Sequence, residues 1–291
     1  MRSILITGGT GTFGRAFVKN WLAHWKADRV VIFSRGEHAQ AEMAEEFNHD
    51  GRLRFFIGDV RDRDRLRRAF NDVDIVVHAA ALKRIEVGHY NPNEMVKTNV
   101  MGTMNVIEAA MDAYVGQVIG ISSDKAWQPI SPYGQTKALA ETLLLNANNT
   151  GGKDGPAFSV VRYGNVAGSN GSVIPKWARL ISENKPIKMS DASCTRFWML
   201  IEEAVQMVYN IIIHNDSQYV KLPNQKIYVP KLPSFCLGDL ATVMGAKEIE
   251  IVGLPSWEKK HEGMADGNTS DIAPRMTEEQ LAAGVRHVLR F

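Results

Sequence analysis

Hydrophobic residues along the first half of the chain gather in short runs, each bounded by turn-forming or polar residues. Runs of this length that are rich in β-branched residues are typical of strands buried on both faces of a parallel sheet. We therefore predict six strands, over residues 4–6, 30–33, 53–57, 75–77, 118–121 and 158–161.

Segments of helical length separate these runs, and their apolar positions recur with the period of an amphipathic helix. Helices are predicted over residues 15–26, 39–48, 63–70, 93–114 and 136–148. Regular alternation of strand and helix predicts an α/β fold, a doubly wound parallel sheet of the Rossmann type with helices on both faces.

The alternation stops after about residue 165. Small and polar residues fill positions 167–172, and helices are predicted over 175–183, 201–214, 237–244 and 277–288, the last with a capping box that starts at Thr277. The chain is therefore predicted to form a Rossmann domain over 1–165 and a smaller, mixed α/β substrate-binding lobe over 166–291, with some interleaving between them.

Charge and cysteine content indicate which partners and which cellular location to expect. The 34 Lys and Arg nearly balance the 32 Asp and Glu, which leaves a net charge of +2 and predicts neither nucleic acid nor membrane as a partner. Two cysteines, Cys194 and Cys236, are too few for a disulfide framework. We see no secretory signal and no apolar stretch near the ~18 residues of a membrane span, so a cytoplasmic protein is expected.

A glycine-rich loop directly follows the first predicted strand and opens the first helix. Glycines at 8, 11 and 14 permit a tight turn, close backbone approach to a pyrophosphate, and close helix–strand packing, while the helix N-terminus favours an anion. This context predicts dinucleotide binding by Gly8, Thr10, Gly11, Thr12, Phe13 and Gly14.

The end of the second predicted strand indicates which dinucleotide is bound. Ser34-Arg35 stands where an NAD-preferring enzyme carries an acidic residue, and a guanidinium suits a 2′-phosphate, so NADP is predicted over NAD. Residues that follow later strands complete the predicted cofactor site: Asp59, Val60, Ala79, Ala80, Ala81, Lys83 and Ser122.

Two pairs of residues carry the candidate chemistry. Tyr133 and Lys137 lie one helical turn apart, and the ammonium favours the phenolate, so Tyr133 is a candidate proton acceptor beside the nicotinamide. Asp124 and Lys125 add an acid and a base, which predicts more than hydride transfer. The alternative interpretations are a solvated turn with a weak surface ion pair and an ordinary exposed helix pair.

With these motifs, the chain resembles the extended short-chain dehydrogenases/reductases, and more narrowly the inverting UDP-N-acetylglucosamine 4,6-dehydratases and related polysaccharide-biosynthesis proteins. In this resemblance the Asp124-Lys125 pair is the most specific element, because ordinary 4-epimerases generally lack it and retaining dehydratases carry Asp-Glu there. The matching segments are 7–14, 33–35, 58–62, 80–83, 97–100, 123–126, 133–137, 162–166, 171–175 and 195–198.

The resemblance implies an NADP-dependent hydro-lyase that removes water from UDP-N-acetylglucosamine and inverts carbon 5. It implies that Tyr133 takes the proton of the 4-hydroxyl, and that Lys137 lowers the phenol pKa and holds the nicotinamide ribose. Lys125 would remove the carbon-5 proton and Asp124 would protonate the leaving water, although the two roles are interchangeable in a coupled pair. Asn99 joins the cofactor site, no metal is implied, and a homo-oligomer is expected by analogy.

Candidate substrate contacts are Lys83, Ser123, Asn165, Val173 and Arg196. The chain departs from the family pattern at three positions: Ala39 replaces a lysine near the 2′-phosphate site, and Asn170 and Pro255 replace arginines expected near the substrate. These departures concern substrate identity more than reaction type.

Two rival functions are a nucleotide-sugar 4-epimerase or 5-epimerase and a non-catalytic NADP-sensing protein. Both epimerase and dehydratase need Tyr133, but elimination alone needs Asp124 and Lys125. A sensor needs neither Tyr133 nor Lys137, so their presence argues against that function.

Overall fold

A computed structural model describes residues 3–25, 28–152, 155–169, 171–214, 220–221 and 227–289, so Asn170 lies outside the described residues. All six strands predicted from the hydrophobic runs are confirmed. They are β1 (Ser3–Thr7), β2 (Arg29–Ser34), β3 (Leu53–Ile57), β4 (Ile75–His78), β5 (Gln117–Ser123) and β6 (Ala157–Tyr163).

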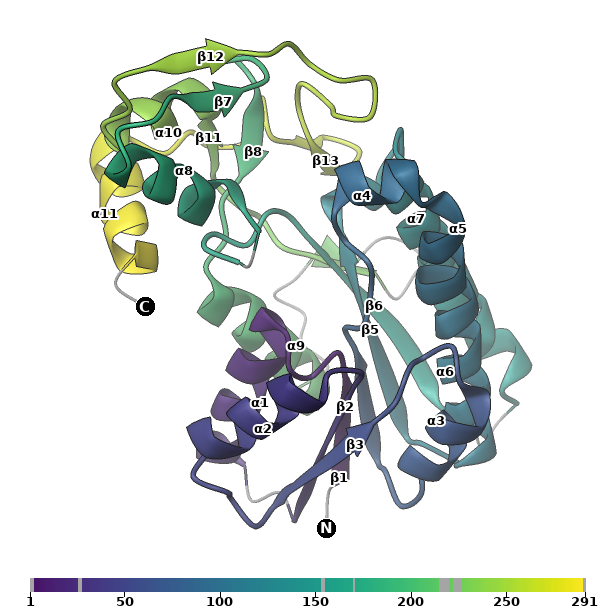
Figure 1. The fold of residues 1–291 in the computed structure, drawn as a ribbon. Coiled ribbons are helices and arrows are strands. Elements are labelled where there is room, and N and C mark those ends of the chain that lie inside the picture. The colour runs from purple at the N-terminus through teal and green to yellow at the C-terminus, as the bar shows by residue number, and fades with distance from the viewer. Residues whose placement is uncertain are drawn as a thin grey trace.

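These strands form the centre of one eight-stranded sheet in the order β3-β2-β1-β4-β5-β6-β10-β9 (Figure 1). The neighbouring strands from β3 to β10 (Ile227–Val229) are parallel, and β9 (Val220–Lys221) pairs antiparallel with β10 at the edge. The strand order reverses between β1 and β4. In open α/β sheets ligands bind at such a point, beyond the carboxyl ends of the strands.

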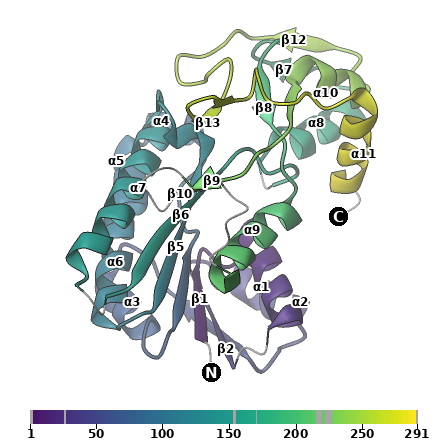
Figure 2. The same ribbon diagram turned by 180° about the vertical axis from the view of Figure 1, so that it is seen from behind.

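Helices cover both faces of the sheet (Figures 1 and 2), which confirms the predicted doubly wound α/β fold. One face carries α1 (Thr12–His24), α2 (Glu37–Glu46) and α9 (Ile201–His214). The other carries α3 (Arg63–Ala69), α5 (Pro92–Met95), the π-helical turn η1 (Val96–Met101), α6 (Gly102–Asp112) and α7 (Pro132–Thr150), while α4 (Ile85–Tyr90) lies above them.

Helix α7 begins earlier than residue 136, where the hydrophobic pattern placed its start. The Ser131 hydroxyl accepts a hydrogen bond from the Gly134 amide at 3.1 Å, and Pro132 occupies the first helical position. Both are standard devices for starting a helix. Tyr133 therefore lies in the first turn of α7.

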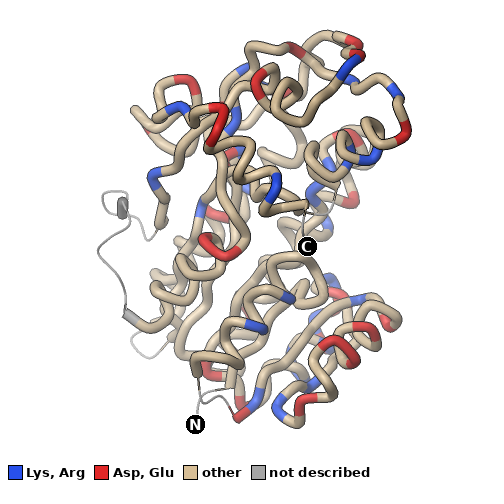
Figure 3. Tube along the Cα trace, turned by 90° about the vertical axis from the view of Figure 1, so that its left-hand side faces the viewer, with Lys and Arg blue, Asp and Glu red and all other residues tan. Residues whose placement is uncertain are grey.

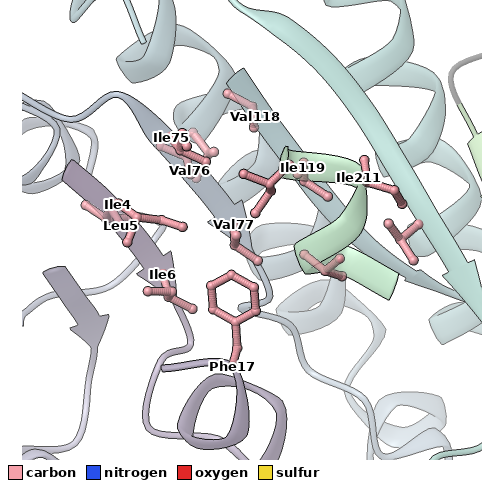
Figure 4. Close-up of a cluster of buried hydrophobic side chains, with 14 of the residues drawn as sticks. Ile4, Leu5, Ile6, Phe17, Ile75, Val76, Val77, Val118, Ile119 and Ile211 are labelled. Atoms are coloured by element: carbon pink, nitrogen blue, oxygen red, sulfur yellow. The ribbon is translucent and has the colours of Figure 1, made fainter. Parts of the chain in front are cut away.

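The main core lies between the sheet and its helices (Figure 4). Ile4, Leu5 and Ile6 of β1 and Val77 of β4 are fully buried, and Phe17 of α1 packs over them. The uninterrupted apolar strands are explained by this arrangement, because a central parallel strand has no solvent-facing side.

The smaller lobe has a second core, formed around Ile174, Trp177, Phe235, Leu240 and Leu281. Two two-stranded sheets, β8–β11 and β7–β12, and three helices surround it, whereas the hairpin β13–β14 lies beside the turn after β5 and contributes Met264 to the main core. Their bounds are α8 (Val173–Ser182), β7 (Ile187–Met189), β8 (Thr195–Phe197), β11 (Ser234–Cys236), α10 (Leu237–Val243), β12 (Ile249–Ile251), β13 (Gly263–Ala265), β14 (Asn268–Thr269) and α11 (Glu278–Leu289).

Two elements from the second half of the chain, α9 and β10, pack with the large sheet and its helices instead of joining the smaller lobe. Helix α9 packs beside α1, where the Tyr209 and Trp21 rings meet edge to face with centroids 5.9 Å apart, and β10 extends the sheet beside β6. The division of domains at residue 165 thus stays a prediction. The predicted capping box is confirmed, because Thr277 and Gln280 exchange side-chain hydrogen bonds with each other's amides at the start of α11.

Basic and acidic residues are interleaved over both lobes (Figure 3), in keeping with the nearly balanced charge. Among the helices of the described residues, none combines the length and apolarity that crossing a membrane requires.

His78 is a buried polar group at the carboxyl end of β4. Its Nδ1 lies 2.7 Å from the Thr7 hydroxyl, and its Nε2 lies 3.0 Å from the Thr103 hydroxyl. Because Thr103 donates its own proton to the Asn99 carbonyl, Nε2 of His78 is the donor and Nδ1 the acceptor. Burial, with a smaller contribution from Lys137, lowers the pKa of His78 to about 3, so the ring is neutral.

This neutral histidine makes stability depend on pH. The unfolded chain binds a proton at His78 below its ordinary pKa near 6.5, whereas the folded chain does not until the pH approaches 3, so stability falls as the pH is lowered through this window. The parent should lose free energy of unfolding between pH 7 and pH 5, and His78→Gln should lose about 2 kcal/mol less over the same range. Urea unfolding at the two pH values measures this difference.

The matched control is His38→Gln, which changes an exposed histidine and should leave the pH dependence of unfolding as in the parent. An equal pH dependence in the parent and His78→Gln would contradict a neutral His78 in the folded state.

Candidate active site

The glycine loop closes tightly at the end of β1. Gly8 has a φ of +69°, and a Cβ there would lie 2.9 Å from the Ala80 backbone. A Cβ on Gly14 would lie 2.3 Å from the Gly9 carbonyl oxygen, so α1 approaches the strand as only glycine permits. A Cβ on Gly11 would meet only the Gly8 carbonyl oxygen, at 3.2 Å, and no side chain caps α1 at this residue. The open N-terminus of α1 therefore fits a pyrophosphate.

A cavity of about 690 Å³ lies over this loop and the carboxyl ends of the strands. Seventeen of the eighteen residues predicted for the cofactor site line it: Gly8, Thr10, Gly11, Thr12, Phe13, Gly14, Ser34, Arg35, Asp59, Val60, Ala79, Ala80, Ala81, Lys83, Ser122, Tyr133 and Lys137. Asn99 is the exception, because it is buried behind the wall, where its side chain pairs with the amide and carbonyl of Leu82 at 2.8 and 3.0 Å. It supports the loop after β4 and does not face the cavity.

The cations at the end of β2 differ in how far they are already paired. Asp59 accepts hydrogen bonds from Nε and Nη2 of Arg61 at 3.0 and 2.7 Å. Arg35 lies 3.8 Å from the same carboxylate, and its side chain remains 57% exposed. The Ser34 hydroxyl is held by Gln40 at 2.9 Å. Arg35 is therefore the cation in this corner that is available to an added phosphate.

Tyr133 and Lys137 project from the first turns of α7 into the cavity, and both are at least nine-tenths buried. Nζ of Lys137 donates to the Ile121 carbonyl at 2.5 Å, and burial, opposed by Glu141, lowers its pKa to about 8. Burial, with a smaller contribution from Asp124, raises the pKa of Tyr133, while Lys125 and the Ser123 hydroxyl oppose this rise. Lys125 is the cation that opposes the effect of burial on Tyr133 in this structure, and a contribution of Lys137 to the phenol pKa stays a prediction.

The two serines at the end of β5 face different surroundings. The Ser122 hydroxyl donates to Glu141 at 2.5 Å, and Glu141 forms a buried ion pair with Arg162. Ser123 donates to Asp124 Oδ1 at 2.8 Å, and its hydroxyl acts to lower the pKa of Tyr133. Ser123, rather than Ser122, therefore lies among the candidate reacting groups.

Asp124 and Lys125 occupy the turn η2 (Asp124–Ala126), directly after β5. Asp124 is 1% exposed, and Nζ of Lys125 lies 3.0 Å from its Oδ1 and 3.4 Å from Oε1 of Glu262. Burial alone would lower the pKa of Lys125, but the two carboxylates outweigh burial and raise it. The alternative of a solvated surface pair is excluded, because these charges are buried beside Tyr133.

A second cavity, of about 340 Å³, adjoins the first one at Lys83, Lys125 and Asn165, which line both. Val173 and Arg196 line it as well, so the predicted substrate residues other than Ser123 meet here, whereas Pro255 lines neither cavity. The buried Arg196 side chain donates to Glu258 and to the carbonyls of Thr195 and Lys260 at 2.7 and 3.1 Å.

Residues that the sequence analysis did not single out complete this site. Glu258 pairs with Arg196, and Glu262 pairs with Lys125. Both glutamates lie near Pro255, but spacing along the chain carries no signal of contacts with residues so far upstream.

Comparison with known proteins gives consistent results. The chain is 42% identical over 273 residues to the UDP-N-acetylglucosamine 4,6-dehydratase (inverting) of Campylobacter jejuni, with 93% of this chain and 79% of the relative covered. It is 35% identical to the UDP-glucose 4-epimerase of Rickettsia bellii, with 90% and 77% covered.

Among solved structures, the dTDP-glucose 4,6-dehydratase DesIV of Streptomyces venezuelae, solved with NAD and TYD bound, shares the fold at a TM-score of 0.82 and 24% identity, with 100% and 97% of the two chains covered. The model of the family described as polysaccharide biosynthesis protein matches residues 4–281. The chain belongs to this family.

Proposed function

We propose that the protein is an NADP-dependent lyase that removes water from carbons 5 and 6 of UDP-N-acetylglucosamine and inverts carbon 5. The observation that carries the proposal is the buried Asp124–Lys125 ion pair, which lines the same cavity as Tyr133 and the glycine loop. The name and 42% identity of the Campylobacter jejuni relative support the same reaction and substrate.

A bound nicotinamide dinucleotide would accept hydride from carbon 4 of the sugar and return it to carbon 6. Tyr133 takes the 4-hydroxyl proton as that carbon becomes a ketone, and the Lys125 ammonium stabilises the phenolate. Lys137, fixed on the Ile121 carbonyl, presents its ammonium toward the cofactor ribose.

The 4-ketone acidifies the carbon-5 proton, and the Asp124–Lys125 pair acts on it. Lys125 carries the proton of the pair, which favours Asp124 as the base at carbon 5 and Lys125 as the acid that protonates the departing 6-hydroxyl. This reverses the roles first assigned from the sequence, within the interchange that a coupled pair allows. A proton drawn from solvent then reaches carbon 5 from the opposite face and completes the inversion.

The second cavity would bind the nucleotide part of the substrate. Lys83 supplies positive charge for the diphosphate, Asn165 supplies an amide, and Val173 offers an apolar surface for the uracil ring, whereas Arg196 lines the cavity already paired with Glu258. Arg35 and Ser34 favour NADP, because the end of β2 carries no acidic side chain to hold a free ribose 2′-hydroxyl. A homo-oligomer, a cytoplasmic location and a metal-independent reaction remain predictions.

The direct test is incubation of the protein and NADP with a panel of UDP-, GDP- and dTDP-sugars, followed by mass spectrometry. We expect UDP-N-acetylglucosamine to lose one water. An isomer of unchanged mass would instead indicate an epimerase, and a complete lack of turnover would favour the sensing protein.

Asp124→Asn is expected to slow water elimination by at least about 100-fold, because an amide cannot accept the carbon-5 proton. Oxidation at carbon 4, seen as formation of reduced cofactor in a single turnover, should persist, since it uses Tyr133. In deuterium oxide the parent product should carry deuterium at carbon 5.

Asp64→Asn serves as the control, because Asp64 is 92% exposed and its neutralisation should change neither rate. Elimination by Asp124→Asn at the parent rate would remove the proposed mechanism.

Arg35→Ala is expected to raise the KM for NADP by about 10- to 100-fold, because one charge-assisted contact with the 2′-phosphate contributes about 1.5–3 kcal/mol. The KM for NAD should stay near its parent value, since NAD lacks this phosphate. Steady-state kinetics with each dinucleotide measures both constants.

The matched control is Arg68→Ala, which removes an exposed arginine of α3 that does not line the cavity. Equal changes in KM for the two dinucleotides would contradict the role of Arg35.

A further inference from the structure

Residues 259–265 of the smaller lobe form a strap that docks on the catalytic turn η2. Lys259 donates through Nζ to the Trp127 carbonyl, and the Met264 carbonyl accepts from Nη1 of Arg162 at 2.6 Å. The strap lies so close that a Cβ on Gly263 would be 2.7 Å from the Trp127 ring. The smaller lobe therefore contributes directly to the surroundings of Asp124 and Lys125.

Glu262, in the middle of this strap, is held on both sides by hydrogen bonds. Its amide donates to the Ser270 hydroxyl at 2.9 Å, its carbonyl accepts from the Ser270 amide at 2.7 Å, and Ser270 is hydrogen-bonded to Thr195. The backbone thus fixes the carboxylate in place, with a side chain that is only 3% exposed.

The Glu262 carboxylate is only partly satisfied. Oε1 lies 3.4 Å from Nζ of Lys125, and Oε2 is buried without a hydrogen-bond partner in the described part of the chain. Asp124 is the other carboxylate that faces Lys125. Its Oδ2 is likewise buried without a hydrogen-bond partner among the described residues. Two carboxylates from different lobes therefore share one ammonium.

The charged and titratable groups that face Lys125 are Asp124, Glu262, Arg196, Tyr133 and Lys259, and Lys259 also lies 4.0 Å from Glu262. Arg196 acts to lower the pKa of Lys125, whereas Asp124 and Glu262 raise it. Lys259 cannot replace Glu262, since it carries the same sign of charge as Lys125.

We propose that Glu262 is a positioning residue of the elimination step, whose carboxylate keeps the Lys125 ammonium charged and directed at the 6-hydroxyl while Asp124 is protonated. This inference rests on the proposed dehydratase function. When the carbon-5 proton passes to Asp124, that side chain becomes neutral and the C–H electrons stay on the sugar as the enolate. Lys125 then gives its proton to the 6-hydroxyl as the C6–O bond breaks and water leaves.

Glu262 gains and loses no proton in this sequence. During the interval in which Asp124 is neutral, Glu262 is the remaining carboxylate beside Lys125 among the described residues. A buried ammonium that loses its last counter-ion is strongly destabilised. Without Glu262, Lys125 would release its proton early, and the acid needed for departure of the hydroxyl would be lost.

Glu262→Gln, a change of charge at nearly constant shape, tests this role in the full-length protein with NADP and UDP-N-acetylglucosamine. We expect elimination to slow by about 10- to 100-fold, which is part of the roughly 100- to 10,000-fold that a positioned acid contributes. Formation of reduced cofactor in a single turnover should change by less than about threefold, since Tyr133 and Lys137 are intact. The alkaline limb of the pH profile for elimination should move to lower pH, because Lys125 loses a carboxylate that raises its pKa.

Glu262→Asp retains the charge and should keep the alkaline limb near its parent position, even if the shorter side chain lowers the rate. Asp266→Asn neutralises an exposed carboxylate in the neighbouring turn and should behave as the parent does. A purely structural role for Glu262 would slow both half-reactions equally and leave the pH profile unmoved, and this result would overturn the inference.

These experiments distinguish failure of the proposed dehydratase function from failure of the proposed role of Glu262. If the parent protein removes no water from any nucleotide sugar, the proposed function is wrong. If the parent eliminates water and Glu262→Gln does so with the same rate and pH profile, only the role of Glu262 is wrong.

Discussion

A buried ammonium shared by two carboxylates is the interaction around which the site is arranged. Lys125 lies in a low-dielectric interior, where a lone charge is unstable, and its partners Asp124 and Glu262 come from the large sheet and from the smaller lobe. Pairing of these charges therefore depends on the contact between the strap 259–265 and η2. The same ammonium opposes the effect of burial on Tyr133, so one cation links the groups proposed for proton transfer at carbons 4, 5 and 6.

The fold brings these groups together through strand order. The glycine loop, the Ala79–Ala81 wall and η2 all follow the carboxyl ends of adjacent strands, β1, β4 and β5, so they meet at one edge of the sheet. Helix α7 then places Tyr133 and Lys137 against the end of β5. The smaller lobe covers this edge with the strap 259–265 and with Arg196 of β8, which converts an open edge into two adjoining cavities.

The parts of the structure that depend on local chemistry were predictable from the sequence. Apolar runs identified the six strands β1 to β6, of which β3 lies at the edge of the sheet, and Thr277 with Gln280 identified the start of α11. The strands of the smaller lobe are two or three residues long, and their stability comes from partners distant in sequence, so no periodic pattern marks them. The contact of Glu262 with Lys125 and the raised pKa of Tyr133 depend on burial and tertiary packing, which spacing does not encode.

The packing of C-terminal elements on the large sheet limits which parts of the chain can be exchanged between relatives. Helix α9 lies against α1 and β10 extends the sheet beside β6, yet both belong to the C-terminal half of the sequence. Replacing that half with the corresponding half of a relative would also replace α9 and β10, which pack on the nucleotide-binding sheet. Divergence in sugar preference is therefore confined to changes that leave this shared packing intact, such as replacements in the loops that line the second cavity.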